Sequence, residues 1–257
     1  MTEKPDQGAS EEWTMNESAG VPAQRSQEPS VTDTDDYRSL VEDVLLLLFQ
    51  PDSNSIAGEN TLFYVLGGAL LADLALEQRV ELRPASGVGG RIHALGSAAP
   101  DDEMQRSMWS YVNSKPRRAQ SVLAAIGPTL REPVLERLVE SGDLVRRRSK
   151  ALGFIPTTTY SLGDERRSRL LAKVRGALVD GTVPDARTAL LGALLSASGT
   201  LPQFHREIPW SGDVYLRGKK LERGDWGAAA ASAAVTRTMV AMIAGSVATT
   251  IVIAHKD

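Results

Sequence analysis

An apolar run at residues 60–78, NTLFYVLGGALLADLALEQ, limits the possible folds of this chain more than any other feature. Its pattern predicts a mostly buried helix that begins near Asn60. Gly67 and Gly68 lie in the middle of this helix, where each costs about 1 kcal/mol of helix stability relative to alanine. We therefore expect both glycines to allow close packing against a neighbouring helix.

The rest of the pattern predicts a mainly α fold, a single globular helical domain with short β-hairpins. A helix is expected in DDYRSLVEDVLLLLF, residues 35–49, with Asp35 or Asp36 as its N-terminal cap. Further helices are expected at residues 101–114, 117–126, 129–141, 163–179, 184–198 and about 225–254. The segments RVELRP and RIHAL are expected to pair as strands. Residues 143–148 and 153–161 are expected to form a second hairpin, after Gly142 ends the preceding helix. Residues 199–224 are mixed and polar.

Charge divides the chain into two parts. Residues 1–36 contain nine acids and two bases, a net charge of -7, whereas the whole chain has -3, so the remainder has +4. These first 36 residues contain almost no periodic apolar positions, and we expect a disordered acidic tail. Residues 37–257 are expected to form the helical domain. Residues 115–150 contain nine bases and four acids, which makes that window locally basic.

Several classes of chemistry have no support in the sequence. Cysteine is absent, which excludes disulfides and thiolate chemistry. His93, His205 and His255 lie far apart without metal-ligand spacing, so no metal site is expected. The chain contains no G-x-S-x-G, P-loop or H-E-x-x-H motif. We therefore expect a non-enzymatic protein with no catalytic residues and no cofactor.

The sharpest chemical signal is the second expected hairpin, which combines bases with an apolar tip. The residues concerned are the bases Arg146, Arg147, Arg148 and Lys150 and the apolar residues Leu152, Phe154 and Ile155. Each base near an anionic leaflet contributes about 1 kcal/mol, and each fully buried large apolar side chain about 1.5 to 3 kcal/mol. This pattern is typical of an interfacial membrane anchor. The alternative is a solvated turn whose Leu152 and Phe154 fold back onto the body.

Five segments together resemble the Golgi phosphoprotein 3 family, over about residues 37–254. They are LVEDVLLLLF, LGGALLADLALEQRVEL, LERLVESGDL, GTVPDARTALLGALLSASG and DWGAAAASAAV. The resemblance implies a mostly helical, single-domain, peripheral membrane protein, and the Ala-rich style is similar to the actinobacterial, hence bacterial, members. Eukaryotic members bind phosphatidylinositol 4-phosphate at the Golgi and recruit glycosyltransferase tails.

The resemblance also implies where a lipid head group would bind. The family's phosphate site uses one tryptophan and a few arginines. A gap-free alignment places that tryptophan at Gly58 and one arginine at Gly67, while Arg131 matches another arginine position. The expected head-group residues are therefore Arg131 and the bases at 146–150, with Leu152, Phe154 and Ile155 at the inserting tip. Attraction to anionic membranes is expected; selective capture of a phosphoinositide is not.

The leading hypothesis is a cytoplasmic protein that associates peripherally with an anionic phospholipid surface. Two alternatives use the same hairpin. One is a winged-helix nucleic-acid binder, although the near-balanced charge of LREPVLERLVES is not typical of a recognition helix, and no nucleic-acid partner is expected. The other is a protein adaptor or homo-oligomer that associates through the 143–161 hairpin.

Overall fold

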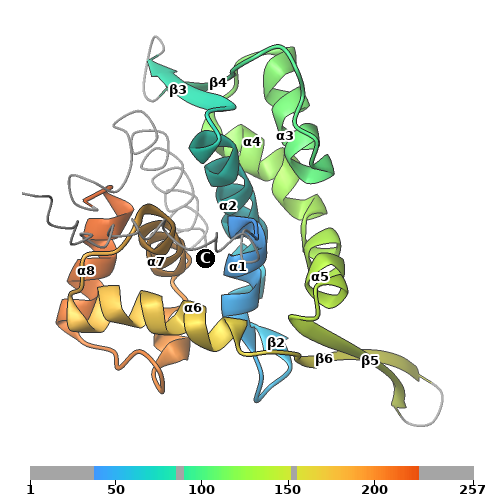
Figure 1. The fold of residues 1–257 in the computed structure, drawn as a ribbon, viewed down its shortest axis with the longest axis vertical. Helices are drawn as coiled ribbons and strands as arrows, with labels where there is room; N and C mark the ends of the chain where they lie inside the picture. Colours follow the sequence, from blue (N-terminus) through green and yellow to red (C-terminus); the bar gives the residue numbers. More distant parts are fainter. Residues whose placement is uncertain (1–37, 85–89, 152–154, 226–257) are drawn as a thin grey trace, which may run out of the picture. The chain divides into compact units, whose positions relative to one another are not determined.

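Helices dominate the structure, a computed structural model that describes residues 38–84, 90–151 and 155–225 (Figure 1). The α-helices are α1 Leu40–Leu48, α2 Leu62–Leu76, α3 Glu103–Ser114, α4 Ala119–Ile126, α5 Arg131–Glu140, α6 Arg166–Arg175, α7 Ala186–Ala197 and α8 Gly212–Glu222. Short helical segments are η1 Glu59–Thr61, η2 Gly127–Thr129, the π-helical η3 Gly176–Asp180 and η4 Leu201–Phe204. The strands are β1 Phe49–Gln50, β2 Ser55–Ile56, β3 Val80–Pro84, β4 Gly90–Ala94, β5 Leu144–Ala151 and β6 Ile155–Leu162. The mainly α prediction is confirmed.

Helix α1 lies at the centre of the described fold. All nine of its residues are buried, including Glu42 and Asp43, and it packs against α2, α5, α6 and α7. The sequence predicted a helix here, and the surrounding helices leave none of its nine residues exposed. A carboxylate in such a position needs a buried partner, because an unpaired buried charge is costly.

Helix α2 confirms the expected use of its two glycines. A Cβ atom on Gly67 would lie 3.2 Å from Cδ2 of Leu123, and one on Gly68 would lie 3.3 Å from Cδ2 of Leu194. Within the described residues, the helical stretch Glu59–Leu76 is long and apolar enough to cross a membrane by length and composition. Most of it is buried against other helices, as expected of a core helix.

The strands form three antiparallel two-stranded sheets, each a hairpin. The pairing of β3 with β4 and of β5 with β6 was predicted, and the latter keeps register from Leu144–Leu162 to Ala151–Ile155. Gly142 ends α5 with a φ of 82°, as its predicted role requires. The polar stretch 199–224 contains the helix α8, which the sequence did not predict. The helix expected at about 225–254 falls almost entirely outside the described residues. The predicted cap of the first helix, Asp35 or Asp36, was wrong, because α1 begins at Leu40 with Ser39 as its cap.

The N-terminus of α1 is held by a carboxylate from α2. Ser39 caps the helix through Glu42 N–H, and Asp73 accepts 2.9 Å hydrogen bonds from Leu40 N–H at both oxygens. Val41 N–H donates to the same side chain at 3.4 Å. Burial raises the pKa of Asp73 to about 7 from its ordinary 3.8, although these backbone hydrogen bonds oppose the rise. The folded protein therefore binds this proton more tightly than the unfolded chain does.

This difference predicts how stability responds to pH. The contribution of Asp73 to the free energy of unfolding should fall as pH rises from about 4 to about 7 and then level off. Asp73→Asn keeps an acceptor oxygen but does not ionise. The free energy of unfolding of this variant, minus that of the wild type, should therefore rise by up to about 4 kcal/mol over that range.

Urea unfolding at a series of pH values measures this difference. Ser39→Ala is the control, because it removes a cap worth about 1 kcal/mol that does not titrate, so its difference from the wild type should be constant with pH. A constant difference for Asp73→Asn as well would contradict the prediction.

Candidate functional site

The β5–β6 hairpin separates its bases by strand alternation. Successive side chains of a strand point to opposite faces, so Arg146, Arg148 and Lys150 share one face and Arg147 lies on the other. The paired strand places Tyr160 opposite Arg146 and Thr158 opposite Arg148. Figure 1 shows β5 and β6 extending away from the junction of α5 and α6.

The hairpin bases are exposed and largely unneutralised. Residues 145–150 are all exposed. Arg146 lies 3.9 Å from Glu136, at the outer limit of an ion pair. Arg147, Arg148 and Lys150 form no ion pair with any residue in the described part of the chain. Leu152 and Phe154 of the predicted tip lie outside the described residues, and for Ile155 only the backbone, paired with Ala151, is described.

The base of the hairpin is fixed by a buried ionic cluster. Asp143, just before β5, accepts a 2.9 Å hydrogen bond from Arg166, which begins α6 just after β6. The same guanidinium donates to Asp43 of α1. Arg187 of α7 also donates to Asp43, with its Nε at 2.7 Å. Asp43, Asp143 and Arg166 are each at most 3% exposed, so the two ends of the hairpin are held together in the core.

The next residue, Arg167, is buried without comparable partners. Its Nε and Nη2 atoms have no hydrogen-bond partner among the described residues. Its Nη1 lies 3.9 Å from Glu207, and burial lowers the pKa of Arg167 despite that carboxylate. Two adjacent arginines on α6 are therefore both buried, but Arg166 is paired with two aspartates, whereas Arg167 has one carboxylate at 3.9 Å.

This contrast predicts opposite effects of the same substitution. Arg166→Met leaves Asp143 buried without its cation and should lower the free energy of unfolding by about 3 to 5 kcal/mol. Arg167→Met removes a cation that burial penalises, and should be neutral or stabilising by about 1 kcal/mol. Urea unfolding of the two variants measures both values. Equal destabilisation by the two substitutions would contradict the assignment.

Arg131 is separated from the hairpin bases by the length of α5. It begins the helix, while β5 follows the helix's other end, and ten helical residues span about 15 Å. Its Nε donates to Glu59 at 2.9 Å and its Nη1 to Glu132 at 2.5 Å. Burial lowers the pKa of Arg131, but these two carboxylates outweigh burial and raise it. The structure therefore does not bring Arg131 together with residues 146–150.

Close backbone packing occupies the positions aligned with the family's other head-group ligands. Gly58 has a φ of 69°, and a Cβ there would lie 2.6 Å from Cγ2 of Thr200. A Cβ on Gly67 would lie 3.5 Å from the Cα of Gly127, and a Cβ on Gly127 itself would lie 2.1 Å from the carbonyl oxygen of Phe63. A tryptophan or arginine side chain at either aligned position would therefore have to displace these neighbours.

Helix α5 presents acids rather than bases to solvent. Glu132, Glu136 and Glu140 are all exposed. A groove of about 470 Å³ lies between α3 and α5 and is lined by Glu103, Glu136 and Glu140 among others. Its one lining arginine, Arg137, is paired with Asp102 at 2.5 Å. Neither surface suits a phosphate group, and no cluster of metal-ligating side chains occurs in the described residues.

A family model described as Golgi phosphoprotein 3 matches residues 40–238. The chain belongs to the Golgi phosphoprotein 3 family. The match covers most of the chain and includes every described helix and the β5–β6 hairpin. A comparison with curated proteins found no match. Family membership confirms the predicted resemblance and the mainly α class; it assigns no ligand to the hairpin, to Arg131 or to any other residue.

Proposed function

We propose that this protein is a non-enzymatic, peripheral membrane protein that binds anionic phospholipid surfaces through the β5–β6 hairpin. The observation that supports the proposal is the run of exposed bases on β5, of which Arg147, Arg148 and Lys150 have no ion pair within the described residues. A cation without an internal partner is available to a negatively charged leaflet. We place the association on the cytoplasmic side, where anionic lipids attract polybasic segments.

The magnitude of this attraction suits reversible binding. Four bases near an anionic leaflet contribute about 4 kcal/mol together, at about 1 kcal/mol each. Insertion of Leu152, Phe154 and Ile155, as their sequence pattern suggests, would add apolar burial to this attraction. The exposed part of β5, from Val145 to Lys150, spans about 17 Å at 3.4 Å per residue, so its bases can reach a surface that the helices do not touch.

The proposal does not depend on Arg131. To bind a phosphate, Arg131 must first leave Glu59 and Glu132, and those carboxylates would then face the anionic head group. The aligned glycines supply no further ligand there. We therefore propose binding to anionic lipid in general, without selection for one phosphoinositide. The acidic exposed face of α5 also argues against a nucleic-acid recognition helix, which normally presents bases or amides.

A triple substitution tests the hairpin. Arg146→Gln, Arg147→Gln and Arg148→Gln together remove about 3 kcal/mol of attraction, which corresponds to roughly 100-fold weaker binding. Sedimentation with vesicles of phosphatidylcholine and phosphatidylserine measures the partition. Wild-type binding should also weaken with added salt, because exposed charges are screened.

Arg131→Gln is the matched control for this experiment. It removes one cation of the same kind from a position where two carboxylates neutralise it, so vesicle binding should change by no more than about twofold. If Arg131→Gln weakens binding as much as the triple substitution does, head-group binding at Arg131 is supported over the hairpin. If the wild-type protein does not sediment with anionic vesicles, the proposed function is wrong.

A second candidate function is self-association through the same hairpin. The β5–β6 sheet has only two strands, so each strand has an edge whose N–H and C=O groups pair with no described strand. Such edges can pair with another copy. Light scattering should then show a dimer or larger species that becomes a monomer when residues 149–156 are deleted. A monomer in both proteins would remove this candidate.

A further inference from the structure

Helix α8 has a fixed orientation in the fold. A Cβ on Gly218 would lie 2.5 Å from Oγ of Ser196, so α8 and α7 are in close contact at this point. Ser196 also donates a 2.6 Å hydrogen bond to Glu222, which is buried. Arg217 donates to the carbonyl oxygens of Leu178 and Val179 in η3. Because these contacts hold the inner face, they also determine which side chains point outward.

The outer face of α8 exposes large apolar side chains. Trp210, just before the helix, is 48% exposed, Tyr215 is 47% exposed and Leu216 is 58% exposed. The Trp210 and Tyr215 rings contact edge to face, with centroids 6.2 Å apart. Among the described residues these three, with Val145 and Val183, are the exposed large hydrophobic residues. Trp210, Tyr215 and Leu216, three of these five residues, therefore lie together at the start and on the outer face of α8.

Cations share this outer face. Helical spacing places Lys219, Lys220 and Arg223 on the same side as Tyr215 and Leu216. Lys219 pairs with Glu222 at 2.9 Å and lies 5.7 Å from the Tyr215 ring. Lys220 and Arg223 are exposed and have no ion pair with other described residues. Asp213 and Asp225 are also exposed nearby and equal Lys220 and Arg223 in number, so these four charges sum to zero.

We propose that the outer face of α8, together with Trp210, is a second contact surface for an anionic lipid bilayer. This proposal rests on the proposed function. Tryptophan and tyrosine are enriched at bilayer interfaces, where the ring lies at the level of the head groups. Lysine and arginine extend their charges toward the phosphates while their methylene chains cover apolar surface. The combination of Trp210, Tyr215 and Leu216 with Lys220 and Arg223 matches that boundary in its mixture of aromatic, apolar and cationic side chains.

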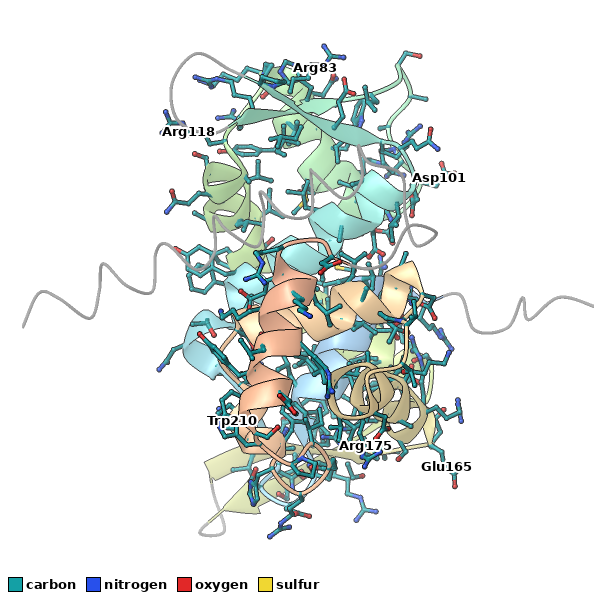
Figure 2. All side chains as sticks on the ribbon, turned by 90° about the vertical axis from the view of Figure 1, so that its left-hand side faces the viewer. Arg83, Asp101, Arg118, Glu165, Arg175 and Trp210 are labelled. Atoms are coloured by element: carbon teal, nitrogen blue, oxygen red, sulfur yellow. The ribbon has the colours of Figure 1, made fainter. Side chains whose placement is uncertain are left out.

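Trp210 and the hairpin lie toward the same end of the domain. Figure 2 shows Trp210 toward the end of the domain where β5 and β6 lie, and Arg118 at the opposite end. In Figure 1, α8 lies on the left of the fold and β5 and β6 extend to the right, so the α8 contact is proposed as separate from the hairpin contact.

Fluorescence quenching tests whether Trp210 reaches lipid. The chain has four tryptophans, and replacing Trp13 and Trp226 by phenylalanine leaves Trp109 and Trp210. Trp109 is buried and donates to the Leu95 carbonyl, so it serves as the internal reference. With phosphatidylserine-containing vesicles of brominated lipid, the emission of Trp210 should be quenched. The same protein with Trp210→Phe should show no quenching.

Charge reversal gives an independent measurement that keeps all tryptophans. Lys220→Glu with Arg223→Glu should weaken sedimentation with anionic vesicles by at least about fivefold. Lys115→Glu with Arg118→Glu makes the same charge change at the opposite end and should alter sedimentation by less than about twofold.

The outcomes separate this proposal from the proposed function. If the protein sediments with vesicles but Trp210 is not quenched and the two charge reversals behave alike, the α8 proposal is wrong and the hairpin proposal stands. If the α8 reversal abolishes association between copies and leaves vesicle binding unchanged, the surface is a protein contact and the α8 proposal is again wrong. If the wild type does not sediment with vesicles, both proposals fail.

Discussion

The ion pairs of Asp43 and Asp143 with Arg166 are the interaction on which the rest of the described fold depends. They join the central helix α1, the base of the β5–β6 hairpin and the start of α6. Arg187 connects α7 to the same cluster by pairing with Asp43. Burial of these charges is costly, and only good geometry with several hydrogen bonds compensates for that cost. The cluster therefore fixes the direction in which the hairpin leaves the helices.

The distance to the nearest carboxylate distinguishes Arg166, Arg131 and the arginines of β5. Arg166 is enclosed between two aspartates and has a structural role. Arg131 is half-buried between two glutamates, which reduces its attraction for an external phosphate. Arg147 and Arg148, on a strand that extends from the helices, meet no described carboxylate and remain available to a partner. Basic residues that look alike in the sequence thus separate into those paired inside the fold and those exposed without a described carboxylate.

Local sequence patterns predicted much of the secondary structure but few of the ion pairs and contacts between distant residues. The β5–β6 hairpin, the stop at Gly142 and the close packing at Gly67 follow from short-range rules, because turn chemistry and helix spacing act over a few residues. Helix α8 was missed, since its exposed face mixes aromatic residues with charges and hides the period of its few buried positions. The ion pair of Arg131 with Glu59 joins residues 72 positions apart, and no local pattern reveals such a contact.

The sequence by itself determined the mainly helical class, the family resemblance and the presence of a basic hairpin. These depend on composition and on periodicity within single elements. Only the tertiary structure decided that Arg131 is neutralised, that Gly58 and Gly67 are packing positions, and that Trp210 and Tyr215 share an exposed face with Lys220. Each of these depends on contacts between segments that are distant in the sequence. Such contacts form only when α1 and its surrounding helices pack together.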